Sequence, residues 1–142
     1  ARVLDRIRRK FDTAAKLVPK PDITTRDKSG RLGIIYFGAT RPAILEALDL
    51  MERDGIKLNA LRLKAFPFTE EVETFCARHD QVFVVEQNRD AQMRSLLMVE
   101  AGVAGEKLVP VLNYDGMPLT ADFVCRALLK TMSPAKARAA AE

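Results

Sequence analysis

The sequence predicts an α/β domain of three layers, in which helices cover both faces of a parallel or mostly parallel sheet. Short apolar, β-branched runs alternate along the chain with stretches of helical periodicity, and the loops between them are short. The runs are apolar almost throughout, which is typical of strands buried on both faces. The 142 residues suit one domain, and 48% hydrophobic with 30% charged residues is an ordinary globular composition.

The amino-terminal stretch is predicted to form an amphipathic helix that ends at Pro19. Residues 1–30 hold nine Lys and Arg against four Asp and Glu, whereas the remainder holds fourteen against fifteen, so the positive excess lies here. Val3, Ile7 and Phe11 mark an apolar face, by which we expect the helix to dock while its basic face stays solvated. The alternative is a patch that binds phosphate or an acidic partner.

Three segments are expected along the chain. Residues 1–30 are predicted to form this helix and a connector with a short edge strand at 23–26, residues 31–132 the α/β domain, and residues 133–142 a frayed tail. Because the chain begins at Ala1 within the helical pattern, we expect it to be a segment of a longer polypeptide.

Four apolar runs predict the main strands of the sheet. They lie at residues 32–37, 57–63, 82–85 and 108–112. Pro110 interrupts the last run, which predicts an edge position or a bulge, because proline cannot donate to a ladder of hydrogen bonds.

A helix is predicted after each of these strands. The first extends to Gly55, the second begins after Thr69, the third spans about 90–101, and the fourth begins after Thr120. Both threonines are expected to cap their helices. His79, the single histidine, follows the second helix, where we expect a cation facing the negative end of the helix dipole.

Ligands in such sheets bind at the carboxyl ends of the strands. Gly38, Thr40 and Arg41 follow the first buried strand and open a helix, so free N–H groups and a guanidinium could hold an anion there. A tight turn at Gly38 and a helix cap at Thr40 explain the same residues, which match no dinucleotide or phosphate-loop motif.

The densest polar cluster beside an apolar strand is formed by Glu86, Gln87, Asn88 and Gln92. Burying such groups unpaired costs about 1–3 kcal/mol each, so we expect a structural network that ties the strand end to a neighbouring loop or subunit. In a catalytic interpretation Glu86 would be the general base, but no nearby sequence element supplies a nucleophile or metal partner.

Two aromatic rings, Phe66 and Phe68, flank Pro67 in the loop after the second of these strands. The rings could anchor a partner, or they could pack on the domain's own helix. The sequence leaves both interpretations open.

Several classes of function are disfavoured by composition. No apolar run reaches the roughly 20 residues of a membrane span, and the basic helix lacks the interleaved aromatic residues of a nucleic-acid site. Cys76 and Cys125 cannot form a disulfide framework or supply an iron–sulfur cluster with four thiolates. We therefore expect a cytoplasmic domain without a metal site, and leave open whether two copies pair as a homodimer.

Three motifs carry a resemblance. The turn at 38–40 after a strand, the F-P-F segment at 66–68 and the run E-Q-N-x-x-x-Q at 86–92 resemble the C-terminal part of the alpha subunit of 2-oxoacid:ferredoxin oxidoreductases, most of all the 2-oxoglutarate type. The similarity covers about 31–130, and the helix before it resembles the connector from that subunit's preceding domain.

The sequence departs from the family pattern at two places. Ala91 stands where the family commonly has Gly before the Gln, and Arg41-Pro42 replaces a small or Gly-containing pair. Backbone contacts made at these positions are therefore in doubt.

The resemblance implies a fold like the transketolase C-terminal domain, with five strands, one antiparallel, between helix layers. It implies a parent enzyme that uses thiamine diphosphate, Mg²⁺ and iron–sulfur clusters to decarboxylate a 2-oxoacid oxidatively onto coenzyme A and reduce ferredoxin. These cofactors would lie in other domains and subunits, so none would be bound by this domain. The isolated chain would be inactive and would meet other subunits, the beta subunit among them.

Two hypotheses follow. In the first, the chain is an assembly domain whose polar network comprises Glu86, Gln87, Asn88 and Gln92 and whose contact is made by Phe66 and Phe68. In the second, it is a stand-alone module that binds anions or nucleotides, coenzyme A phosphates for example, through Gly38, Thr40 and Arg41.

Overall fold

Five segments pair into one sheet in the order β1-β3-β2-β4-β5, in the computed structural model that describes residues 2–132. β1 is antiparallel to β3, and every other neighbouring pair is parallel. The mostly parallel five-stranded sheet predicted above is thereby confirmed. The strands are β1 (Asp22–Thr24), β2 (Leu32–Phe37), β3 (Asn59–Leu63), β4 (Gln81–Glu86) and β5 (Leu108–Leu112).

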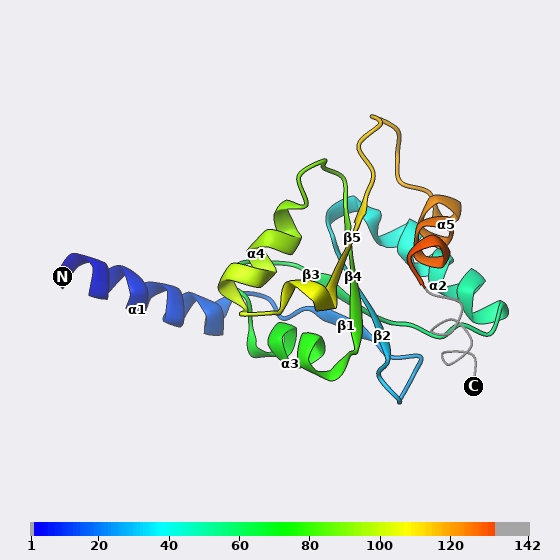
Figure 1. Cartoon of the computed structure of the whole chain (residues 1–142). Helices are drawn as coiled ribbons and strands as arrows, with labels where there is room; N and C mark the ends of the chain where they lie inside the picture. The colour runs from blue at the N-terminus through cyan, green and yellow to red at the C-terminus, as the bar shows by residue number, and fades with distance from the viewer. Residues whose placement is uncertain (1, 133–142) are drawn as a thin grey trace.

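Helices cover both faces of this sheet (Figure 1). α2 and α5 lie on one face, and α3 and α4 lie on the other. Within the described residues, no helix combines the length and apolarity that crossing a membrane requires. The helices are α1 (Arg2–Leu17), α2 (Arg41–Arg53), α3 (Glu70–Arg78), α4 (Gln92–Glu100) and α5 (Ala121–Thr131), with short 3₁₀ turns η1 (Gly38–Thr40) and η2 (Gly105–Lys107).

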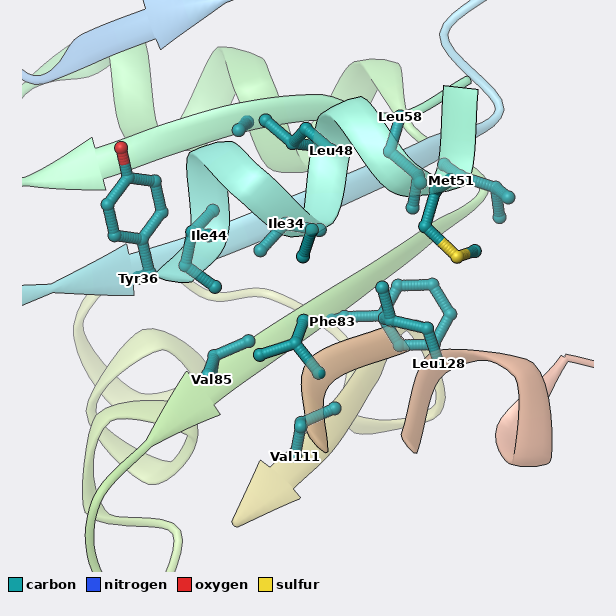
Figure 2. Close-up of a cluster of buried hydrophobic side chains, with 14 of the residues drawn as sticks. Ile34, Tyr36, Ile44, Leu48, Met51, Leu58, Phe83, Val85, Val111 and Leu128 are labelled. Carbon is teal, nitrogen blue, oxygen red and sulfur yellow. The ribbon is translucent and has the colours of Figure 1, made fainter. Parts of the chain in front are cut away.

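The alternation of side chains along each strand divides the core in two. Ile34 and Phe83 face α2 and α5, where they join a cluster with Leu128 (Figure 2). The next residue of β2, Ile35, points to the opposite face and packs in a cluster with Phe75 of α3. Because both faces are covered, almost every residue of β2 and β4 is buried, which explains their continuous apolar sequence.

The two edge strands of the sheet agree with what the sequence predicted from Pro110 and from the connector at 23–26. β5 is an edge strand, which is one of the two alternatives that Pro110 left open, and β1 forms the other edge one residue before its expected start. The hydroxyl of Thr120 accepts the N–H of Phe123 at 3.2 Å and caps α5. Thr69 occupies the N-cap position of α3 in extended backbone, as predicted, but its hydroxyl makes no capping hydrogen bond. The predicted frayed tail at 133–142 lies outside the described residues.

α1 differs from its predicted role. It extends away from the sheet (Figure 1), and no residue of it is buried. Of its apolar face, Val3, Ile7 and Phe11 remain exposed, and the rings of Phe11 and Phe66 form an edge-to-face pair with centroids 6.2 Å apart. The expectation that this face docks is therefore not met within the described chain, because the helix leaves the body of the domain.

Candidate functional site

The order of the strands reverses between β2 and β4, which lie side by side in the middle of the sheet. From β2 the chain passes through α2 to β3 on one side, and from β4 it passes through α4 to β5 on the other. The turns at Gly38–Thr40 and 87–91 therefore flank the point at which open α/β sheets bind ligands. Both turns lie toward the top of Figure 1.

Glu86, the last residue of β4, is completely buried. Its Oε2 accepts the backbone N–H of Met93 at 2.7 Å, and its Oε1 accepts that of Arg94 at 2.9 Å. These N–H groups belong to the first turn of α4 and have no carbonyl partner within the helix. The positive end of the helix dipole also favours a carboxylate there. Glu86 thus caps the helix that follows its own strand.

The other members of the predicted polar cluster lie further out. Nδ2 of Asn88 donates to Oε2 of Glu86 at 2.8 Å, and its Oδ1 accepts the backbone N–H groups of Asp90 at 3.1 Å and Gln92 at 3.3 Å. The side chains of Gln87 and Gln92 are exposed. The structure therefore brings Glu86 and Asn88 together, with the backbone of Gln92, and leaves two amide side chains at the surface.

Ala91 has a left-handed backbone, with φ of 50° and ψ of 48°. This region suits glycine, because an L side chain there approaches its own carbonyl group. Ala91 is the position at which the resembling family commonly has glycine, so the departure noted in the sequence falls on a strained residue.

In the turn after β2, the side chain of Thr40 does not cap α2. Thr40 is buried in helical backbone, so its Oγ1 reaches back and donates to the carbonyl of Phe37 at 2.7 Å, making no capping bond to α2. Gly38 has a φ of 66°, which explains the glycine. Arg41, the first residue of α2, is exposed beside this turn.

Two further cations lie beside this turn, at the carboxyl end of β3. The sequence analysis did not identify them. Nη2 of Arg62 donates to the carbonyl of Gly38 at 3.4 Å, and Nη1 is 3.8 Å from Oδ2 of Asp22. Lys64 binds the same carboxylate, and this hydrogen bond, with the charges of Arg62 and Arg41, lowers the pKa of Asp22. Nε of Arg62 is buried with no hydrogen-bond partner among the described residues. Three cations thus surround one carboxylate.

The two aromatic rings in the loop after β3 differ in their exposure. Phe66 is 41% exposed, whereas Phe68 is half-buried against the core beneath α3 and α4. Their centroids lie 5.4 Å apart in an edge-to-face arrangement. Phe66 is therefore the ring available to a partner, and Phe68 supports it from the body.

His79 is buried, which contradicts the expected cation at a helix end. Its Nδ1 lies 2.6 Å from the carbonyl of Phe75 and its Nε2 lies 2.9 Å from Nδ2 of Asn59. With a carbonyl on one side and an amide N–H on the other, the ring donates from Nδ1 and accepts at Nε2 as neutral imidazole. Burial lowers its pKa. A cavity of about 280 Å³ beside it lies at the opposite end of β3 from the strand-end turns.

The cysteines do not fit an iron–sulfur cluster, which takes four thiolates. Cys76 packs in the core beneath α3 and α4, and Cys125 packs in the core on the other face of the sheet. Burial raises the pKa of the Cys76 thiol to about 11. Between residues 2 and 132, no three His, Cys, Asp or Glu side chains are grouped to hold a metal ion.

No protein-family model matches the chain. In sequence it is 25% identical over 134 residues to subunit alpha of the 2-oxoacid:ferredoxin oxidoreductase 2 of Aeropyrum pernix. The match covers 92% of this chain and 21% of the relative, so the chain spans about a fifth of that protein's length.

The fold is shared with three solved structures. A 2-oxoglutarate:ferredoxin oxidoreductase from Magnetococcus marinus, with 2-oxoglutarate, coenzyme A and succinyl-CoA bound, aligns with a TM-score of 0.74 at 21% identity, over 84% of this chain and 21% of that one. A split-gene transketolase in an inactive beta4 tetramer aligns at 0.58 with 21% identity, over 77% and 40%. The alpha chain of a probable 2-oxoacid ferredoxin oxidoreductase from Thermoplasma acidophilum aligns at 0.52 with 25% identity, over 78% and 95%.

These likenesses agree with the motifs read from the sequence. The relatives in sequence and in fold include alpha subunits of 2-oxoacid:ferredoxin oxidoreductases, as the resemblance predicted. The transketolase neighbour confirms the predicted fold type.

Proposed function

We propose that this relative of the alpha subunits of 2-oxoacid:ferredoxin oxidoreductases is the assembly domain of such an enzyme, of the 2-oxoglutarate type and in the cytoplasm. Residues 31–132 would form the transketolase C-terminal-like unit, and residues 1–30 the helix and connector that join it to the preceding domain. Thiamine diphosphate, Mg²⁺ and the iron–sulfur clusters would be held by other domains and subunits. The beta subunit would be its partner, and ferredoxin would meet the assembled complex.

The engagement of Glu86 carries this proposal. Glu86 is the carboxylate at the switch point of the sheet that is best placed to act as a base, but both of its oxygens accept hydrogen bonds from the first turn of α4. A general base must be free to accept a proton from a bound substrate. A carboxylate held by two backbone N–H groups and by Asn88 instead fixes the turn at 87–91, whose exposed Gln87 faces outward for contact.

The test compares the parent alpha subunit with and without residues 31–132, each coexpressed with its beta subunit. We expect the deletion to abolish co-elution in gel filtration and reduction of methyl viologen by 2-oxoglutarate and coenzyme A. An active, intact complex without this segment would refute the proposal. Turnover by the purified chain alone would refute it as well.

A second candidate function is the binding of coenzyme A phosphates, which the three cations at the ends of β2 and β3 favour. The carboxylate of Asp22 lies among the three cations Arg41, Arg62 and Lys64. Nε of Arg62 has no hydrogen-bond partner among the described residues. Guanidinium groups bind phosphate through paired hydrogen bonds. In calorimetric titrations with coenzyme A, Arg62→Ala is expected to weaken binding about tenfold, a loss of roughly 1.4 kcal/mol.

The matched control is Arg53→Ala, which removes an exposed guanidinium from the far end of α2. Dephospho-coenzyme A identifies which phosphate is held. Absence of heat at millimolar coenzyme A, or equal weakening by both variants, would eliminate this candidate.

A further inference from the structure

The apolar face of α1 is exposed over most of its length. Val3 is 60% exposed, Leu4 70%, Ile7 44% and Phe11 50%. The spacing of these residues places them on one face of the helix. A contiguous apolar surface of this kind on a globular domain marks a site of interaction.

Basic side chains border this face on both sides. At about 100° per residue, Arg6 and Lys10 fall along one border and Arg8 along the other. All three are exposed, and α1 as a whole carries six Lys and Arg against only Asp5 and Asp12. A second copy of α1 would bring like charges together along the borders, whereas a partner with carboxylates at its rim would match them.

The apolar face continues from α1 onto the body of the domain. The ring of Phe11 contacts Phe66, which contacts Phe68 in turn. A cavity of about 650 Å³ opens where these rings meet, and Glu73 and Glu100 line it. A bilayer with anionic headgroups throughout would be repelled by these two exposed carboxylates, whereas a protein can place its own carboxylates along the borders of α1 and away from Glu73 and Glu100, so the surface favours a protein over a membrane.

We propose that α1 with Phe66 docks an apolar protein surface that is bordered by carboxylates. The docking surface consists of Val3, Leu4, Ile7, Phe11 and Phe66, with Arg6, Arg8 and Lys10 at its rim. The identification of the partner as another domain or subunit of the same oxidoreductase rests on the proposed function. The chemistry of the partner rests on α1 alone.

The test uses the full chain and a labelled synthetic helix of about four turns, with Leu along one face and Glu on both borders, measured by fluorescence anisotropy. A second peptide carries Lys in place of Glu. The acidic peptide is expected to bind at least ~10-fold more tightly at low salt, and Ile7→Glu is expected to weaken it by a similar factor. The double variant Arg6→Glu/Lys10→Glu is expected to reverse the preference between the peptides.

Control variants distinguish docking at α1 from a general effect of surface charge or of unfolding. Arg53→Glu alters an exposed cation on α2 and is expected to change nothing, and melting curves of the α1 variants should match the parent because no residue of α1 is buried. Any of three results would overturn the proposal: equal affinity for both peptides, no binding of the acidic peptide at ~1 mM, or tight binding of phosphatidylserine vesicles. So would a dimer in sedimentation equilibrium that Ile7→Glu abolishes.

The outcome is independent of the co-elution test for the beta subunit. A chain that binds the acidic peptide but contributes nothing to co-elution would refute the proposed function and leave this docking surface standing. A chain that supports co-elution while ignoring the charge of the peptide would refute the docking surface alone.

Discussion

The carboxylate of Glu86 accepts the backbone N–H of Met93 at 2.7 Å, across the turn at 87–91. This contact joins the end of a buried strand to the start of the helix that follows it. The turn between them lies at the switch point of the sheet and is closed by Asn88. A polar cluster that resembles a reactive site in the sequence therefore serves to fix the shape of a surface turn.

Glu86→Gln is expected to destabilise the domain by about 2 kcal/mol, because hydrogen bonds to charged groups contribute roughly 1.5–3 kcal/mol. The amide places a donor where two N–H groups require acceptors, and the helix dipole loses its compensating charge. Urea unfolding at pH 7 measures the change. Glu100→Gln, the same replacement at the exposed end of α4, is the matched control and should leave the free energy of unfolding unaltered. Equal effects of the two variants would contradict the capping role.

Ala91→Gly is expected to stabilise the domain by about 1 kcal/mol, because Ala91 has a φ of 50° and a left-handed L residue costs roughly 1–2 kcal/mol. Part of this gain is offset by the greater freedom of glycine in the unfolded chain. Thermal and urea unfolding measure the shift. Ala101→Gly at the other end of α4, where φ is −102°, relieves no strain and should lower stability. A lower midpoint for Ala91→Gly would show that the backbone is not strained there.

Much of the sheet could be predicted because burial on both faces leaves a direct mark on the sequence. β2 and β4 are continuous apolar runs, and a single proline limited β5 to an edge position or a bulge, of which the structure has the edge. The cap at Thr120 was predicted as well, since its partner Phe123 is only three residues away.

The site was less predictable because its contacts join residues far apart in the chain. The side chain of Arg62 reaches Gly38 and Asp22 on two other elements, so the cluster of cations has no linear motif. His79 is neutral because Asn59, which starts β3, donates to it in the core. Only the alternation of Arg62 and Lys64 on one face of a strand end could have indicated the basic cluster.

Gly33→Ala is expected to destabilise the domain by about 1–3 kcal/mol through overpacking. A Cβ at this position in β2 would lie 2.9 Å from Cε1 of Phe75 and 3.1 Å from Cγ of His79, and both rings are buried under α3. Gly105→Ala is the control, because its Cβ would meet only the far ends of two flexible side chains, with Cε of Met98 at 3.0 Å and Nη2 of Arg94 at 3.4 Å, and these can move. Urea unfolding compares the two, and a Gly33→Ala variant as stable as Gly105→Ala would show that α3 yields freely.

The free energy of unfolding is expected to fall as the pH drops below about 6.5, and His79 is the reason. Burial lowers its pKa in the folded protein, while in the unfolded chain it titrates near its ordinary value of 6.5. Between these two values the unfolded state binds more protons, so stability decreases with falling pH and the loss levels off below the folded pKa.

The contact between His79 and Asn59 explains why protonation of His79 lowers the free energy of unfolding. A proton on Nε2 of His79 would face the amide N–H of Asn59, which lies 2.9 Å away and donates to that nitrogen in the neutral ring. His79→Gln keeps an acceptor within reach of Asn59 but cannot titrate, so its urea midpoint should be flat between pH 7.5 and 5, where the parent's midpoint declines. The ring proton resonances of this single histidine report the folded pKa directly. A pKa at or above 6.5, or the same decline in His79→Gln, would assign the pH dependence to other groups.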